Sequence, residues 1–158
     1  MARYTRNILL LEGDPALLEE AASRLRDPAG KEALSFAVII PAEDTDSREE
    51  LWGTAGDAEE TDMILFRGGT ALEYTFDTEK TCPVPVMRRL AVMYPDFRMS
   101  VRYAYEDLGN GCGIYESEEG SSELVFREPE DPFVFACDVW GRDPDEELSE
   151  LGINYAEE

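Results

Sequence analysis

The chain has 158 residues, of which 36 are acidic, 14 are basic and none is histidine, so its formal net charge is −22. The absence of histidine excludes Ser-His-Asp and Cys-His catalytic groups, HExxH zinc sites and the usual ligands of zinc deaminases. A hydrophobic content of 43%, with seven Phe and seven Tyr, excludes a disordered acidic chain and predicts a folded protein with a proper core.

The N-terminal part predicts a strand, a helix and a second strand. Residues 7–12 form a short apolar run that is typical of a buried strand. Gly13-Asp14-Pro15 then supplies a turn, an N-cap and a first-turn proline. Apolar residues follow at helical spacing through Arg26: Leu17, Leu18, Ala21, Ala22 and Leu25. Residues 33–40 alternate apolar positions before Pro41, which predicts a strand: Leu34, Phe36, Val38 and Ile40.

The middle of the chain predicts a loop, two strands and a helix. Residues 42–60 are polar and irregular, so we expect a loop insertion with one apolar anchor at Leu51-Trp52. Residues 62–66 and 71–77 are typical of strands, and Gly68-Gly69 indicates a bend between them. Residues 83–94 have apolar side chains at helical spacing and are followed by Pro95, which predicts a second helix.

The last third predicts further strands and a short terminal helix. Residues 98–105 alternate as a strand does, and Asn110-Gly111 predicts a hairpin to a strand over 112–116. Residues 124–127 are consistent with another strand, whereas 133–140 fit a buried strand and a short helix equally well. Asp143-Pro144, acidic residues and a final Gly152 predict a short C-terminal helix.

This order of elements predicts an α+β fold of the ferredoxin-like split βαβ type. We expect it to carry an acidic loop insertion, an extra hairpin and a short C-terminal helix. The whole chain, residues 1–158, is expected to be a single domain. Its core would span about residues 7–117, and an acidic C-terminal extension would span about residues 118–158.

Several short stretches resemble one family. They are NILLLEG at 7–13, Leu34-Ser35-Phe36 with a strand ending at Pro41, LWGT at 51–54 with Asp57-Ala58, and PVP at 83–85 opening a helix that runs to Tyr94-Pro95. Together they resemble the YubB-type ferredoxin-like domains of plasmids and phages over roughly residues 7–117. The resemblance implies that fold and a mobile-element origin, and it brings no established reaction. The chain departs from the family at residues 55–57 and 77–82, where family members carry aromatic side chains.

The excess charge is concentrated in two segments. Residues 41–70 have nine acids and two bases, and residues 105–158 have seventeen acids and two bases, whereas 1–40 and 71–104 are nearly neutral. A compact chain of this length is about 40 Å across, and duplex DNA carries roughly 23 charges over that length. The protein therefore matches a piece of duplex in charge. A basic partner would relieve the self-repulsion that so many carboxylates create.

These charges predict a non-enzymatic acidic inhibitor from a phage or other mobile element. It would bind a basic, nucleic-acid-binding host protein without binding nucleic acid or a membrane itself. By analogy with small acidic inhibitors, an anti-CRISPR protein acting as a nucleic-acid mimic is the specific form we expect. Such mimicry requires the two acidic segments to be neighbours in space. The predicted partner-binding residues are Glu43, Asp44, Asp46, Glu49, Glu50, Asp57, Glu59, Glu60, Glu116, Glu118, Glu119, Glu123, Glu128, Glu130 and Asp131.

Two other functions remain open on the sequence. One is a plasmid or phage ferredoxin-like module that binds a small ligand or oligomerises, with its acidity serving solubility. The other is a hydrolase with a pair of carboxylates, although the abundance of acids singles out no pair. A third possibility, a calcium loop at residues 44–50, lacks the glycine of an EF-hand.

The remaining signals concern location and cofactors. No apolar run reaches the roughly 20 residues that a bilayer span needs, and no signal peptide is evident, so a cytoplasmic protein is expected. Cys82, Cys112 and Cys137 have no CxxC spacing, so we expect buried free thiols and neither a disulfide framework nor a zinc site. No cofactor or metal is expected. Four arginines are expected to pair with neighbouring acids: Arg88, Arg89, Arg98 and Arg102.

Overall fold

A computed structural model describes residues 4–42, 45–108, 111–117 and 121–150. In these residues the fold is α+β, with one six-stranded antiparallel sheet in the order β2-β3-β1-β4-β5-β6. The strands are β1 (Tyr4–Glu12), β2 (Glu59–Phe66), β3 (Ala71–Glu79), β4 (Arg98–Tyr105), β5 (Cys112–Ser117) and β6 (Val125–Arg127). The helices are α1 (Pro15–Leu25), α2 (Thr45–Trp52), α3 (Val84–Met93), α4 (Pro132–Trp140) and α5 (Pro144–Glu150), with a 3-10 turn, η1 (Phe36–Val38).

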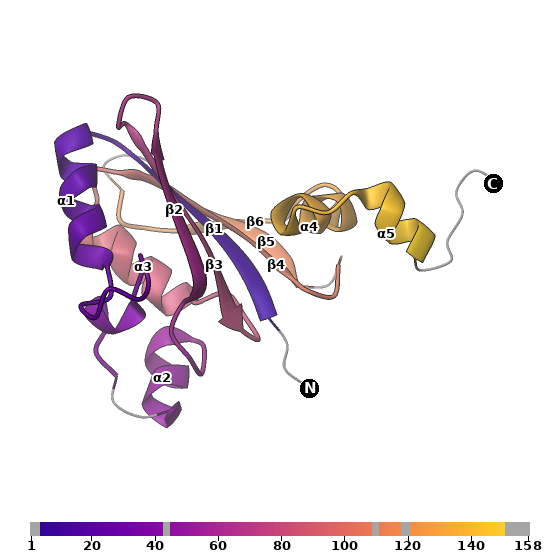
Figure 1. The fold of residues 1–158 in the computed structure, drawn as a ribbon, viewed down its shortest axis with the longest axis horizontal. Helices are drawn as coiled ribbons and strands as arrows, with labels where there is room; N and C mark the ends of the chain where they lie inside the picture. Colours follow the sequence, from indigo (N-terminus) through magenta and orange to yellow (C-terminus); the bar gives the residue numbers. More distant parts are fainter. Residues whose placement is uncertain (1–3, 43–44, 109–110, 118–120, 151–158) are drawn as a thin grey trace.

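The sheet has a different cover on each face (Figure 1). Strand β1 lies between β3 and β4, and Asn7 faces Phe76 on one neighbour and Tyr103 on the other. Alternate residues of β1 and β3 are buried in the main core with α1 and α3: Leu9, Leu11, Leu72, Tyr74 and Phe76. The residues between them point to the opposite face, as the period of two along a strand requires. Helix α4 packs on that opposite face, against β4, β1 and β5.

Local sequence explains where α1 begins and which side it buries. The Asp14 carboxylate accepts hydrogen bonds from the backbone N–H groups of Ala16 (3.1 Å) and Leu17 (3.2 Å), and Pro15 occupies the first turn. Leu18, Ala21 and Leu25 are buried and recur at three- and four-residue spacing. The predicted helix is therefore confirmed, because its cap and its apolar stripe agree.

The predicted strand over residues 33–40 is wrong. Residues 36–38 instead form η1, because the Asp57 carboxylate accepts hydrogen bonds from the backbone N–H groups of Phe36 (2.6 Å) and Ala37 (3.4 Å). The Phe36 ring packs edge-on against Trp52, with centroids 5.7 Å apart, and this contact holds the turn in the core. The strand that pairs with β3 on the side away from β1 is β2, and residues 33–40 are not part of the sheet.

The predicted loop over residues 42–60 contains a helix, α2, and the beginning of β2. The expected anchor is confirmed for Trp52, which is 1% exposed and donates from its indole nitrogen to the Ile40 carbonyl (2.7 Å). Leu51 is not part of it, since it is 40% exposed. Because residues 45–52 are helical, they do not form a calcium-binding loop.

Residues 133–140 lie in helix α4. The Asp131 side chain accepts a hydrogen bond from Val134 N–H (3.2 Å), Pro132 occupies the first turn and Gly141 ends the helix with a left-handed φ of 68°. These are the start and stop signals of a helix. The expected pairing of β4 with β5 is confirmed. Two residues of the predicted turns and caps, Asn110 and Gly152, lie outside the described residues.

A candidate acidic binding surface

Strand pairing brings acidic residues together at one end of β1, β2 and β3. In register, Glu59 of β2 faces Asp77 of β3, and Tyr4 of β1 faces Glu79 of β3. Glu106 follows β4 and its backbone N–H donates to the Tyr4 carbonyl (2.9 Å). We call the following residues the acidic cluster: Glu32, Glu59, Glu60, Asp62, Asp77, Glu79 and Glu106.

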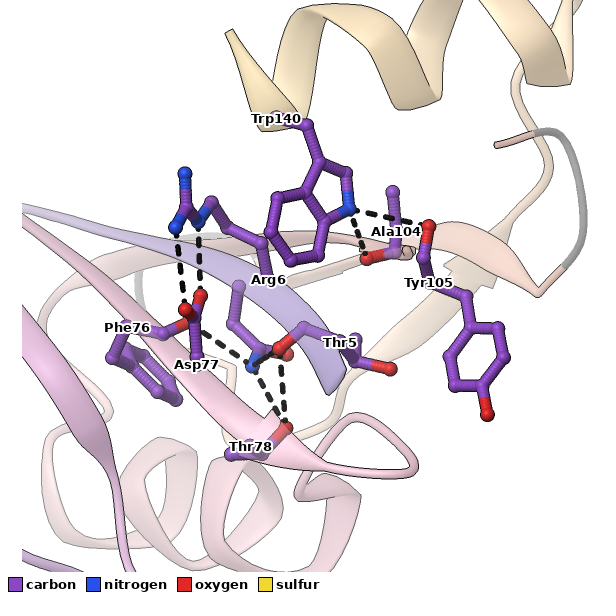
Figure 2. A network of polar contacts seen from close by, with 9 residues as sticks. Thr5, Arg6, Phe76, Asp77, Thr78, Ala104, Tyr105 and Trp140 are labelled. Atoms are coloured by element: carbon purple, nitrogen blue, oxygen red, sulfur yellow. Dashed lines mark hydrogen bonds and ion pairs between the residues drawn. The ribbon is translucent and has the colours of Figure 1, made fainter. Parts of the chain in front are cut away.

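One arginine compensates part of this charge. Arg6 lies opposite Asp77 and donates to both of its carboxylate oxygens, from Nε at 2.9 Å and from a terminal nitrogen at 3.2 Å. The Arg6 guanidinium also lies 4.4 Å from the centre of the Trp140 ring. Figure 2 shows Arg6 facing Asp77 and the Trp140 indole nitrogen directed at Ala104 and Tyr105. Arg6 therefore connects the acidic cluster to helix α4.

The electrostatics of the cluster are those of crowded like charges. Partial burial of its carboxyl group raises the pKa of Glu59, and the nearby carboxylates of Glu79, Asp77, Glu60 and Glu32 raise it further. The pKa of the Tyr4 hydroxyl is also raised. The main cause is the Glu59 carboxylate, and partial burial and the carboxylates of Glu79, Asp77 and Glu106 add to it. Both shifts mean that the negatively charged forms of Glu59 and Tyr4 are disfavoured at this end of the sheet.

One member of the cluster has a role within the fold. The Glu32 carboxylate accepts a hydrogen bond from the Thr61 backbone N–H at 3.0 Å. Thr61 lies between Glu59 and Asp62, where the register of β2 against β3 shifts. Glu32 thus accepts a hydrogen bond from a backbone N–H group that lies at the irregularity of β2, where pairing with β3 is interrupted.

The first predicted acidic segment contributes only part of its residues to this surface. Glu59 and Glu60 belong to the acidic cluster, whereas Glu49 and Glu50 are exposed on α2. Asp46 also belongs to α2, and Glu43 and Asp44 lie outside the described residues.

The structure gives Asp57 a role inside the fold. Its carboxylate accepts hydrogen bonds from Ser35 Oγ (3.0 Å) and from the N–H groups of Phe36, Ala37 and Ala58. The hydrogen bonds that the Asp57 carboxylate accepts therefore hold η1 next to the start of β2.

The second predicted acidic segment lies elsewhere on the molecule. Glu116 accepts from Arg127 Nε at 2.9 Å, and Asp131 caps α4, so both have partners within the fold. Three residues of this segment are exposed: Glu123, Glu128 and Glu130. Glu118 and Glu119 lie outside the described residues.

Glu106, at the start of the second segment, joins the acidic cluster, but the predicted partner-binding residues of the two segments, where the structure describes them, do not converge. Three strands, β3, β1 and β4, separate β2 from β5 in the sheet. Because neighbouring strands are about 4.8 Å apart, β2 and β5 are separated by roughly 19 Å, well beyond the Debye length of about 8 Å at physiological salt. The expectation that the two segments form one continuous duplex-like face is therefore not met by the described residues.

The charge of each segment does not predict three of the seven residues in the acidic cluster. Glu32, Asp77 and Glu79 belong to stretches that are nearly neutral overall, and they join Glu59 only through strand pairing and the Glu32 contact. The sequence does contain one usable signal. In 72–79 the acids alternate with core residues, so they must share the face opposite the core.

The three cysteines are poorly suited to act as nucleophiles. Burial is the main cause that raises the pKa of all three cysteine thiols, Cys82, Cys112 and Cys137, which disfavours a reactive thiolate. Cys82 and Cys137 are buried as expected, and Cys112 is half-buried. Among the described residues, no group of three or more Cys, Asp or Glu is placed to hold a metal ion. None of the described helices is both long and apolar enough to span a bilayer.

The predicted pairing of the arginines with acids is observed for Arg102. Arg102 on β4 donates to the Asp138 carboxylate of α4 at 3.1 Å. This contact adds a second link between the sheet and α4, beside the one that Arg6 makes with Trp140.

Comparison with protein-family models, with curated proteins and with solved structures finds no match to this chain.

Proposed function

We propose that this protein is a non-enzymatic acidic inhibitor that binds a basic, nucleic-acid-binding host protein, and that the acidic cluster is its main contact surface. The observation that carries the proposal is the strand pairing that gathers Glu59, Asp77 and Glu79 at one end of the sheet. The neighbouring carboxylates add to burial in raising the pKa of Glu59, as crowded like charges do. Lys or Arg side chains of a partner would remove that repulsion on binding. The partner would thus lose the surface that it uses for phosphates.

The proposal differs from mimicry of a long duplex. Since β2 and the β5–β6 pair lie at opposite edges of the sheet, one partner groove would contact the β2–β3 edge together with Glu106. The acids beside β5 and β6 would be left for solubility or a second contact. An inhibitor of mobile-element origin, specifically an anti-CRISPR protein, is the form that analogy with small acidic inhibitors supports.

We also propose that about residues 7–117 form a ferredoxin-like split βαβ core related to the YubB-type domains. The strand order β2-β3-β1-β4 supports this proposal, as does the position of α1 between β1 and β2 and of α3 between β3 and β4 in the chain. The fold itself implies no activity, so the functional proposal depends on the charged surface alone.

The test compares two charge-matched triple variants as inhibitors of nucleic-acid binding by a panel of CRISPR effectors and other DNA-processing proteins. The first variant, Glu59→Gln with Asp62→Asn and Glu79→Gln, removes three charges from the acidic cluster. The control, Glu123→Gln with Glu128→Gln and Glu130→Gln, removes three exposed charges beside β6. We expect the first variant to lose at least tenfold in inhibition of the responsive effector and the control to lose less than twofold.

Salt provides the second readout. Inhibition by the unmodified protein should weaken steeply between low and physiological salt, because exposed charges more than a Debye length apart are screened. Equal losses in both triple variants would show that the position of the charge does not matter. Inhibition that is independent of salt and of both triple substitutions would contradict the proposal.

A further inference from the structure

Strand β2 leaves an unusual amount of apolar surface at an edge of the sheet. In the described sheet it pairs with β3 on one side and forms the edge on the other. Three consecutive side chains are well exposed: Met63 at 38%, Ile64 at 57% and Leu65 at 46%. An edge strand presents unpaired backbone N–H and C=O groups, and proteins normally protect such an edge with charges, bulges or a covering segment.

Here the protection covers only the beginning of the strand. The register shift between Glu59 and Asp62 interrupts pairing, and the Glu32 carboxylate takes the Thr61 N–H. Residues 62–66 continue in regular register with β3, from Asp62 opposite Thr75 to Phe66 opposite Ala71. About five residues of regular edge are therefore available to a further strand.

The edge is also hollowed on one face. Met63 and Leu65 face Tyr74 and Leu72 across the ladder and so lie on the α1 side of the sheet. With residues of α1 they line a groove of about 210 Å³. Its other lining residues are Glu19, Ala22, Ser23 and Arg26. The floor and strand side of the groove are apolar, so it suits apolar side chains.

The opposite face of the same edge is acidic. Asp62, Ile64 and Phe66 point there, beside Glu73 on β3, and Glu59 and Asp77 continue the same face toward the acidic cluster. In the described part of this face, Arg6 is paired with Asp77 and Arg67 with Glu12. A strand placed beside β2 would thus meet Met63 and Leu65 on one face. On the other face it would meet Asp62 and Ile64, with Glu73 one strand further in.

We propose that the free edge of β2 is a strand-addition site for an extended segment of the basic partner, in which apolar residues alternate with Lys or Arg. This inference rests on the proposed function and specifies how the partner is held. Successive side chains of a strand point to opposite faces, so the apolar ones enter the groove beside α1. The basic ones lay their aliphatic stems over Ile64 and direct their charged ends to Asp62 and Glu73. Main-chain hydrogen bonds supply affinity and the alternating side chains supply specificity.

Charge decides against a second copy of this chain as the occupant. Each copy has a net charge of −22, so edge-to-edge pairing would bring two strongly acidic molecules together. A basic segment relieves repulsion at the same place where a second copy would increase it.

The test uses a fluorescently labelled peptide of alternating Lys and Val, with sequence KVKVKVK, and the same peptide methylated on its internal backbone nitrogens. The two probes have equal charge and equal side chains, but the methylated one cannot donate to a neighbouring strand. Fluorescence anisotropy with the full chain should give at least tenfold tighter binding for the unmethylated peptide. Amide hydrogen exchange should slow at residues 63–66 when that peptide is bound.

Substitutions locate the site. Met63→Gln with Leu65→Gln removes apolar contacts in the groove without altering charge, and should weaken binding of the unmethylated peptide at least fivefold. Val125→Gln is the matched control, because Val125 is 65% exposed on β6 at the other edge of the sheet, and it should have no effect. Circular dichroism checks that each variant is folded.

The results separate this inference from the proposed function. If both peptides bind equally and the triple variant in the acidic cluster weakens them equally, attraction of a basic partner holds and strand addition is wrong. Binding of neither peptide contradicts both. A concentration-dependent dimer with residues 63–66 already protected from exchange would show that a second copy occupies the edge, and would overturn the inference.

Discussion

The Asp57 carboxylate is a structural residue among many surface acids. It accepts from Ser35 Oγ and from three backbone N–H groups, of Phe36, Ala37 and Ala58. These groups belong to η1 and to the chain entering β2, so one side chain joins two segments that are about twenty residues apart. A buried or half-buried backbone donor that loses its acceptor is costly, which makes this residue sensitive to substitution.

Asp57→Ala is expected to destabilise the protein by about 1–3 kcal/mol, because several backbone donors lose their acceptor together. Urea unfolding followed by tryptophan fluorescence measures the change. Asp57→Asn retains one acceptor oxygen and should cost clearly less. A loss in Asp57→Asn equal to that in Asp57→Ala would mean that the negative charge, and not the hydrogen bonding, stabilises η1.

At the scale of elements, α4 determines how much of the second sheet face is open. Ala136 and Val139 bury Ala104 of β4 in a small second core, which explains why Ala104 is fully buried on a face where an open sheet would expose it. The Trp140 indole nitrogen donates to the carbonyls of Ala104 (2.9 Å) and Tyr105 (3.2 Å), as Figure 2 shows. The helix is thus attached by a small core, one bifurcated hydrogen bond and the Arg6 and Arg102 contacts.

Trp140→Phe is expected to weaken the attachment of α4 by about 1 kcal/mol, since the indole donor is lost while most of the ring contact remains. Amide hydrogen exchange should become faster in α4 and unchanged at the centre of β1 and β3, where the main core continues to protect the backbone. Trp52→Phe serves as a comparison, because Trp52 lies in the main core and its loss should affect the whole sheet. Uniformly faster exchange in Trp140→Phe would contradict independent attachment.

At the scale of the whole molecule, self-repulsion opposes the folded state. The net charge of −22 is much larger than the roughly 2–8 that small soluble domains usually carry. The described cations that pair with acids do so mostly on the surface, where a single ion pair contributes little. Hydrophobic burial in the two cores must therefore outweigh a repulsion that depends on the ionic strength.

We expect the melting temperature to rise with sodium chloride from 10 mM to 500 mM, because the Debye length shortens from about 30 Å to a few ångström. For a domain of this size, each 1 kcal/mol gained raises the melting temperature by roughly 2–4 °C. Scanning calorimetry checks the trend, with sucrose of equal osmolality as the control for general solute effects. A melting temperature that stays constant or falls with salt would show that repulsion is not a major term in stability.

Local patterns predict most of the elements, and the exceptions have identifiable causes. The alternation over 98–105 matches β4, and the apolar stripes of α1 and α3 agree with their sequence signals. The predicted start of α5 agrees as well, because the Asp143 carboxylate accepts from the N–H groups of Asp145 and Glu146. Residues 33–40 alternate like a strand but become η1, because Asp57 and Trp52, both distant in sequence, take their backbone groups. Residues 133–140 are apolar nearly throughout, on the exposed side of α4 as well as the buried one, so periodicity could not separate helix from strand.

The sequence by itself determined the charge, the exclusion of histidine-dependent chemistry and the mixed α+β class, because these depend on composition and short-range pattern. Tertiary structure alone decided which acids act together. Glu59 joins Asp77 and Glu79 through the pairing of β2 with β3, whereas Glu116 and Asp131 are placed toward the other edge. It also decided that Met63, Ile64 and Leu65 lie on a free edge, because strand order depends on contacts between residues far apart in the chain.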